Sequence, residues 1–114
     1  MNEKKILIII PTYNEGLIIE EVISEINTIF EKVDILVIDA YSSDETYNQV
    51  KKHGVKIIQI DKIFGIGLAI ETGILYAYKN EYDFLVRIDG DGQHSPSDVK
   101  NLLELAKHGP SVDT

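Results

Sequence analysis

Apolar and polar positions along the chain follow two alternating patterns, which predict strands and helices in turn. Four short runs rich in β-branched residues and leucine predict strands buried on both faces. These runs are residues 5–10, 33–38, 55–60 and 83–88. After each run, apolar residues recur at helical spacing. They predict helices over residues 18–30, 44–53, 68–79 and 96–108.

Repeated strand–helix units of this length predict an α/β fold. We expect a Rossmann-like three-layer sandwich with a mainly parallel sheet and right-handed crossovers. The 114 residues are enough for one domain only, so residues 1–114 are expected to form a single unit. In such a sheet the strand-to-helix loops lie at one edge, where ligands of open α/β sheets bind.

Polar residues at the starts of the predicted helices fit helix caps, which bond otherwise unpaired backbone N–H groups. The candidates are Thr12 or Asn14 with Glu15 for the first helix, Ser42 with Glu45 for the second, and Ser95 before Pro96 for the fourth.

Gly65 and Gly67 predict a loop over residues 64–67, after the third strand. The pair resembles part of a dinucleotide-binding fingerprint, but the third glycine of that motif is missing. It also follows the third strand instead of the first, so an NAD-binding fold is disfavoured.

An acidic pair, Asp89 and Asp91, follows the last predicted strand. Negative charge at the end of a buried strand is costly unless a cation binds it. Hard ions such as Mg²⁺ or Mn²⁺ take carboxylate oxygens together with substrate phosphates. A polar turn that happens to be acidic is the competing interpretation, and on its own such a pair is more often a turn.

Residues in other loops at the same edge favour a metal site over an acidic turn. Tyr13 follows the first strand and could stack against a flat base, and Asp39 follows the second strand and could accept hydrogen bonds from a base or a ribose. Because these residues converge with the acidic pair, the sequence predicts a site for a nucleoside diphosphate.

Composition narrows the classes of partner. Eleven basic and 19 acidic residues give a formal net charge of −8, the reverse of a nucleic-acid-binding surface. There are no cysteines, which excludes disulfides and thiolate metal sites. The N-terminal apolar run of about five residues is too short for a signal peptide or a membrane span. A cytoplasmic location is therefore expected.

Four motifs in order resemble the family 2 glycosyltransferases, and most closely the branch of dolichol-phosphate mannosyltransferases and polyprenyl-phosphate sugar transferases. They are Ile10-Pro11-Thr12-Tyr13-Asn14-Glu15, then Val37-Ile38-Asp39 with Ser42-Ser43-Asp44-Glu45-Thr46, then Gly65, Gly67, Ala69 and Gly73, then residues 89–96. The resemblance extends over essentially the whole chain.

The resemblance implies a GT-A fold, a UDP- or GDP-type sugar donor and Mg²⁺ or Mn²⁺. It implies site residues by position: Pro11, Tyr13 and Glu15 at the nucleoside, Asp39 at the base or ribose, Asp89 and Asp91 at the metal and diphosphate, and Gln93 close by. It also implies an acceptor such as a polyprenyl phosphate or a glycan, a role in cell-envelope biosynthesis, and a parent protein at the cytoplasmic face of a membrane.

Two departures from the family pattern concern ligand contacts. Ala40 and Tyr41 stand where the family usually has Asp and Gly, which leaves the base preference open. Ile66 stands where a Lys or Arg is frequent. Lys62 or Arg87 could replace that cation, and neither is assigned the role.

The catalytic residues are not assigned. In inverting members of the family the general base lies beyond the metal motif, so this chain is expected to be a truncated donor-binding half that is inactive alone. An alternative is a metal-binding regulatory α/β module, but that class needs acidic residues after the first strand, where this chain has residues 11–13. A sheet edge left exposed by truncation is expected to permit homo-oligomers.

Overall fold

The computed structural model describes residues 4–14, 16, 18–90 and 96–108. Four strands and four α-helices alternate, with one short 3₁₀ helix before the third α-helix. In chain order they are β1 (Ile6–Thr12), α1 (Ile19–Ile29), β2 (Asp34–Asp39), α2 (Thr46–Lys52), β3 (Lys56–Gln59), η1 (Lys62–Phe64), α3 (Gly65–Lys79), β4 (Phe84–Arg87) and α4 (Pro96–His108).

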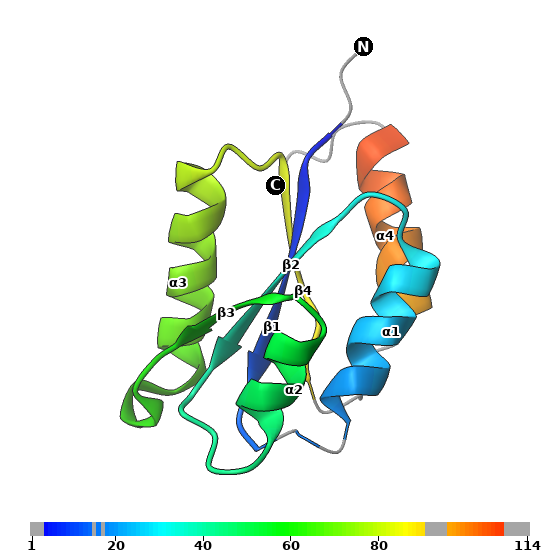
Figure 1. Cartoon of the computed structure of the whole chain (residues 1–114). Helices are drawn as coiled ribbons and strands as arrows, with labels where there is room; N and C mark the ends of the chain where they lie inside the picture. Colours follow the sequence, from blue (N-terminus) through cyan, green and yellow to red (C-terminus); the bar gives the residue numbers. More distant parts are fainter. Residues whose placement is uncertain (1–3, 15, 17, 91–95, 109–114) are drawn as a thin grey trace.

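The strands form one parallel sheet in the order β3-β2-β1-β4. The chain moves outward from β1 to β3 and then returns past β1 to β4. A right-handed crossover places its helix on one face of the sheet when the chain moves in one direction across the strands, and on the opposite face when it moves back. Helix α3 accordingly lies on one face, and α1 and α4 on the other (Figure 1). The point at which the strand order reverses lies between β1 and β4. The predicted α/β class with a parallel sheet is confirmed.

Alternate residues of β1 serve two separate cores. Ile6, Ile8 and Ile10 pack with α1 and α4, whereas Leu7 and Ile9 pack on the face covered by α3. Period-two alternation along a strand produces this division. Since both faces are covered, the strand reads as a continuous apolar run.

The two faces are packed with side chains of different size. Helix α1 buries large side chains, whereas the buried residues of α3 are Ala69, Gly73 and Ala77. A Cβ atom added at Gly73 would lie 2.7 Å from Cδ1 of Ile9. Small residues therefore let α3 approach β1 closely.

Most element boundaries differ from the sequence predictions by one or more residues, and two of these differences lie near the cavity described below. Strand β1 continues to Thr12, whose carbonyl accepts a 3.0 Å hydrogen bond from the Ala40 N–H. The loop predicted over residues 64–67 is instead the end of η1 and the first turn of α3. Gly65 has a φ of +66°, which glycine adopts without steric cost, so the chain turns there and begins the helix at once.

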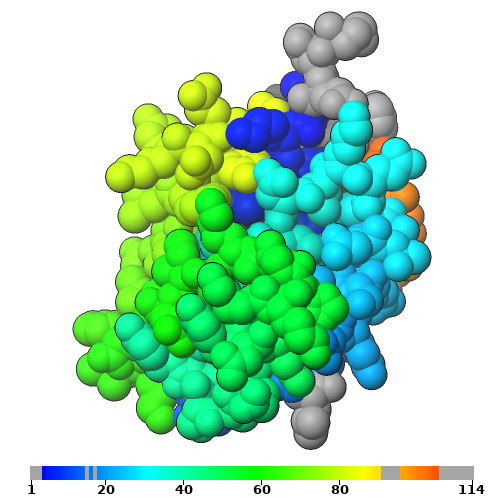
Figure 2. Space-filling view, viewed as in Figure 1, coloured from blue at the N-terminus to red at the C-terminus, as the bar shows by residue number. Residues whose placement is uncertain are grey.

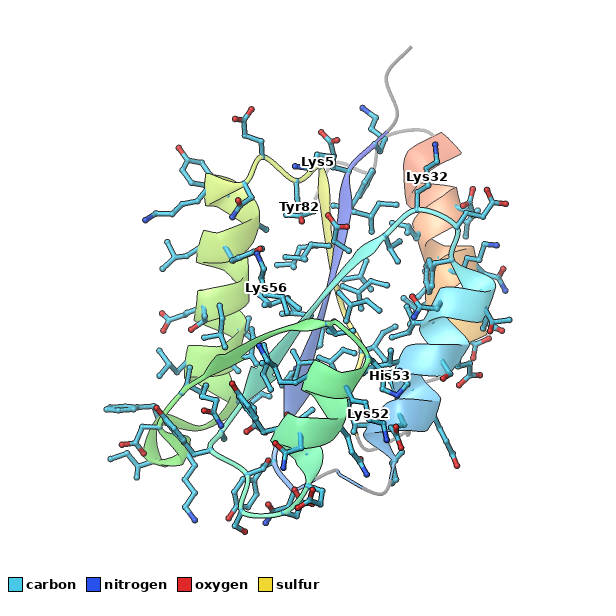
Figure 3. The ribbon with its side chains drawn as sticks, viewed as in Figure 1. Lys5, Lys32, Lys52, His53, Lys56 and Tyr82 are labelled. Atoms are coloured by element: carbon cyan, nitrogen blue, oxygen red, sulfur yellow. The ribbon has the colours of Figure 1, made fainter. Side chains whose placement is uncertain are left out.

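A separate group of contacts joins elements at the opposite end of the sheet (Figure 3). Tyr82 donates a 2.6 Å hydrogen bond to Asp34 Oδ2, and Lys5 Nζ lies 4.5 Å from the centre of the Tyr82 ring. Burial and the bond to Asp34 raise the pKa of Tyr82.

A different contact joins the helices α1 and α2. His53 Nε2 lies 2.8 Å from a carboxylate oxygen of Glu20.

In the space-filling view of the same side, α2 and the residues before it cover the lower front of the molecule (Figure 2). Among the residues that the structure describes, no helix combines the length and apolar character that crossing a membrane requires.

Candidate functional site

A cavity of about 590 Å³ opens at the carboxyl end of the sheet, where the strand order reverses. Residues from the ends of β1, β2 and β4, from the segment after β3 that includes η1, and from the start of α3 line it. They are Pro11, Thr12, Tyr13, Ile38, Ala40, Ile60, Lys62, Gly65, Ile66, Ala69, Arg87, Asp89 and Gly90. Open α/β sheets bind ligands at such a switch point. Three of the residues predicted from the sequence, Pro11, Tyr13 and Asp89, are therefore brought together here.

Asp39 lies next to this cavity, but its carboxylate is buried and bonded within the protein. Thr12 Oγ1 donates a 2.8 Å hydrogen bond to Oδ1, and the Ser42 N–H donates a 2.9 Å bond to Oδ2. The Ser42 hydroxyl and Gln59 Nε2 donate to the same carboxylate. Asp39 has 0% of its surface exposed. In this structure Asp39 thus fixes the ends of β1, β2 and β3 relative to one another.

The loops after β1 and β2 are also joined through Asn14. Its N–H donates a 2.8 Å hydrogen bond to Ser42 Oγ, and its side-chain Oδ1 accepts a 2.8 Å bond from the Ser43 N–H. The hydroxyl groups of Thr12 and Ser42 point to Asp39. The predicted caps by Thr12, Asn14 and Ser42 are wrong, because their side chains bond Asp39 and Ser43, and neither α1 nor α2 has a side-chain bond from its N-cap residue. Glu15 and Ser95, which the capping predictions also used, lie outside the described residues.

Asp44 takes the role that the capping prediction gave to Ser42. Its Oδ1 accepts a 2.9 Å hydrogen bond from the Thr46 N–H at the start of α2, and its Oδ2 accepts a 3.1 Å bond from the Gly16 N–H. Burial raises the pKa of Asp44, but the hydrogen bonds from Thr46 and Gly16 outweigh it and hold the pKa below its ordinary value. One carboxylate therefore starts α2 and fixes the loop after β1.

Tyr13 and Lys62 lie together on one wall of the cavity. Lys62 Nζ donates a 3.0 Å hydrogen bond to the Tyr13 hydroxyl and lies 5.0 Å from the ring centre. This bond and the charge interaction with Tyr13 raise the pKa of Lys62, so the amine is cationic at neutral pH. The Tyr13 side chain is 41% exposed, which leaves ring surface available to a ligand.

Arg87 and Asp89 form an ion pair in the same cavity. Arg87 Nε lies 2.9 Å from Asp89 Oδ1, and the two side chains are 42% and 22% exposed.

A Cβ atom added at Gly90 would lie 2.7 Å from Thr12 Cγ2, so only glycine allows this close approach of the chain after β4 to the end of β1.

The charge of the cavity differs in sign from that of the protein. Its described lining carries two cations, Lys62 and Arg87, and one carboxylate, Asp89, whereas the formal net charge of the chain is −8. The sequence pattern assigns a role to neither cation. The strand alternation of β4 could have placed Arg87 beside Asp89, since residues two apart share a face. No local signal pairs Lys62 with Tyr13, which is 49 residues away.

The sequence model described as "Glycosyl transferase family 2" matches residues 7–114. The chain belongs to this family. The resemblance predicted from the four motifs is confirmed.

Family 2 relatives with named activities align over most of the chain. It is 33% identical over 114 residues to a dolichol-phosphate mannosyltransferase of Pyrococcus furiosus, an alignment that covers 95% of this chain and 32% of the relative. It is 31% identical over 121 residues to a UDP-N-acetylglucosamine–dolichyl-phosphate N-acetylglucosaminyltransferase of Methanococcus voltae, covering 91% and 48%. The chain thus spans between 32% and 48% of the length of these two relatives.

A similar fold is also found among solved structures. Glucosyl-3-phosphoglycerate synthase from Mycobacterium tuberculosis, crystallised with Mn²⁺, UDP and glucosyl-3-phosphoglycerate, superposes with a TM-score of 0.75 at 23% identity. The match covers 93% of this chain and 40% of the synthase chain. This likeness supports the predicted GT-A fold.

The side chains present fit a divalent ion that is shared with a phosphorylated ligand. Such ions commonly take one or two carboxylates from the protein and their remaining oxygens from phosphates. Asp89 supplies one carboxylate to the cavity, and no cluster of three or more metal-ligating side chains occurs within the described ranges. One carboxylate in a cavity that also carries cations is consistent with an ion that takes further oxygens from phosphates. Asp91, Gln93 and Glu15, which the family resemblance also assigns, lie outside the described residues.

Proposed function

We propose that the parent protein transfers a sugar from a nucleoside-diphosphate donor to an acceptor, and that this chain supplies the donor-binding half. The observation that carries the proposal is the cavity at the sheet switch point. Two cations, a carboxylate and a partly exposed aromatic ring line it in a chain that belongs to glycosyltransferase family 2.

The charges of the cavity suit the diphosphate of such a donor. Guanidinium and ammonium groups form charge-assisted hydrogen bonds with phosphate oxygens, and these bonds are roughly twice as strong as neutral ones. Lys62 and Arg87 are placed to supply them from two walls of the cavity. They would replace the cation that the family frequently has at the position of Ile66.

The nucleoside would occupy the part of the cavity formed by Pro11 and Tyr13. Stacking of a base on an aromatic side chain contributes about 1–3 kcal/mol. A direct contact of Asp39 with the base or ribose, as the resemblance implies, requires at least one of its internal donors to give way. We propose that Asp39 mainly holds the pocket walls in place through Thr12 and Ser42.

Asp89 and, by the family resemblance, Asp91 would hold the Mg²⁺ or Mn²⁺, with Gln93 and Glu15 nearby. A divalent ion bound there neutralises the charge that develops on the departing nucleoside diphosphate. In the overall reaction, the bond between the sugar anomeric carbon and the diphosphate oxygen breaks. A new bond forms from that carbon to an acceptor oxygen. No general base is assigned among the described residues.

The acceptor is proposed from the relatives alone. Their names describe transfer to dolichol phosphate and dolichyl phosphate. A lipid-linked phosphate acceptor for the parent protein is consistent with those names, and it would bring the parent to the cytoplasmic face of a membrane.

Titration calorimetry with UDP and GDP, each with and without Mn²⁺, tests the donor site. We expect nucleotide binding that strengthens in the presence of Mn²⁺, and we expect Asp89→Asn to remove that strengthening because it removes the negative charge that attracts the ion. The matched control is Glu71→Gln, an exposed acidic residue of α3 outside the cavity lining. The proposal fails if neither nucleotide binds, or if both variants behave alike.

A further inference from the structure

Arg87 forms an ion pair with the carboxylate of Asp89, the group that the proposed metal needs as a ligand. Arg87 is the last residue of β4, and Ile88 between the two side chains is buried toward the opposite core. Residues two apart in an extended chain share a face, so Arg87 and Asp89 point into one cavity. Arg87 Nε lies 2.9 Å from Asp89 Oδ1.

This pair is suited to exchange its partners. Both side chains reach solvent, at 42% and 22% exposure, and ion pairs between solvent-accessible groups contribute only about 0–1 kcal/mol. A diphosphate offers the guanidinium planar, bidentate hydrogen bonding that competes well with a single carboxylate contact. Replacing the ion pair by a guanidinium–diphosphate contact and a carboxylate–metal contact therefore costs little free energy.

We infer that Arg87 is an exchangeable counter-ion of the donor site. It neutralises Asp89 when the cavity holds no donor, and it transfers to the donor diphosphate when Asp89 binds the divalent ion. This inference rests on the proposed function and adds a coupling to it. Metal alone must compete with Arg87, whereas metal and nucleotide together satisfy both charges, so each strengthens the binding of the other by the same factor.

The substitution Arg87→Gln separates this role from a scaffolding role, because it should change two affinities in opposite directions. Without the competing cation, Mn²⁺ alone should bind about two- to fivefold more tightly, the range that a weak ion pair accounts for. UDP in saturating Mn²⁺ should bind roughly tenfold to a hundredfold more weakly, since a charge-assisted hydrogen bond is lost. Mn²⁺ binding is measured by electron paramagnetic resonance and UDP binding by calorimetry.

Two further variants control the experiment. Arg87→Lys keeps the charge without the bidentate fork, so it should retain weak Mn²⁺ binding and lose only part of the UDP affinity. Lys52→Gln removes a cation that lies 3.9 Å from Glu20 and outside the cavity lining, and it should leave both affinities within a factor of about two of the unmodified protein.

The outcomes separate the inference from the proposed function. If the unmodified protein binds Mn²⁺ and UDP but Arg87→Gln weakens both or changes neither, the exchange is refuted and the donor site stands. If the unmodified protein binds neither probe, the donor site fails and the exchange falls with it.

Discussion

Single residues at the carboxyl edge adopt conformations that the local sequence does not favour. Tyr41 has a φ of +49°, in the left-handed region, and its side chain is 61% exposed. It stands where the family usually has glycine, and an L-residue with a side chain pays a steric penalty there. The chain therefore keeps a turn suited to glycine while carrying a tyrosine.

Comparing Tyr41→Gly with Tyr41→Ala isolates this backbone penalty, since both variants remove the ring. We expect the glycine variant to be more stable by about 1 kcal/mol in urea denaturation. Tyr78, an exposed residue within α3, provides a control in which the order of stability of the glycine and alanine variants should be reversed. There the alanine variant should be more stable by about 1 kcal/mol, because glycine is unfavourable inside a helix. Equal stability of the two Tyr41 variants would show that the turn is not strained.

Asp44 is the residue whose contribution should depend on pH. Its pKa is lowered in the folded protein, so the ionised carboxylate stabilises the fold above its ordinary pKa of 3.8, and this contribution is lost as the pH falls through the lowered value. Asp44→Ala should cost about 1 kcal/mol at neutral pH, as for the loss of a helix cap.

The measurement for Asp44 is urea denaturation across a pH series. The stability difference between the unmodified protein and Asp44→Ala should shrink between about pH 5 and pH 2. Glu45→Ala is the control, because its carboxylate accepts only a 3.3 Å side-chain bond from Asn48 among the bonds described. A difference that stays constant or grows in acid contradicts the assigned role.

At the scale of elements, the strands were predictable and the loop contacts were not. The four apolar runs predicted β1 to β4. Coverage of both faces by helices explains the run in β1, whose residues are all buried, but not in β4, whose residues alternate between half-buried and exposed. Helix starts were harder, because the residues predicted to cap them bond other residues, and a different neighbour, Asp44, bonds the start of α2. Asp44 bonds Gly16, 28 residues away, and Asn14 bonds Ser43, 29 residues away. Capping rules do not consider contacts between loops, so they could not show that Asn14 and Ser42 bond each other's loops instead of a helix start.

The packing of α3 on the sheet depends on Gly73. Alanine normally stabilises a helix relative to glycine by about 1 kcal/mol. At Gly73 the added Cβ would lie 2.7 Å from Ile9 Cδ1 and 3.0 Å from Ile9 Cγ2, so we expect Gly73→Ala to destabilise the protein by about 1–3 kcal/mol through overpacking.

Gly67 provides the matched control in the same helix. An added Cβ there would meet nothing within 4 Å, so Gly67→Ala should be neutral or stabilising by up to about 1 kcal/mol. Thermal denaturation of both variants distinguishes the cases. Stabilisation by Gly73→Ala would mean that α3 does not pack closely on β1.

For the whole molecule, topology explains why the site could be anticipated. A parallel sheet brings the ends of all strands to one edge, and this was enough to predict that Pro11, Tyr13 and Asp89 meet. Strand alternation could have placed Arg87 beside Asp89, whereas sequence could not show that Asp39 is buried among internal donors, or that Lys62 lines the cavity. Those facts depend on side-chain positions in three dimensions. The expected self-association through a sheet edge stays a prediction.

The proposed function requires that this acidic α/β protein hold a cation-lined site for a metal and a nucleoside diphosphate. A crystal structure with UDP and Mn²⁺, using manganese anomalous scattering, tests it most directly. We expect an anomalous peak beside Asp89, with the diphosphate between Lys62 and Arg87 and the base near Tyr13. Manganese distant from Asp89, or UDP bound outside this cavity, would contradict it.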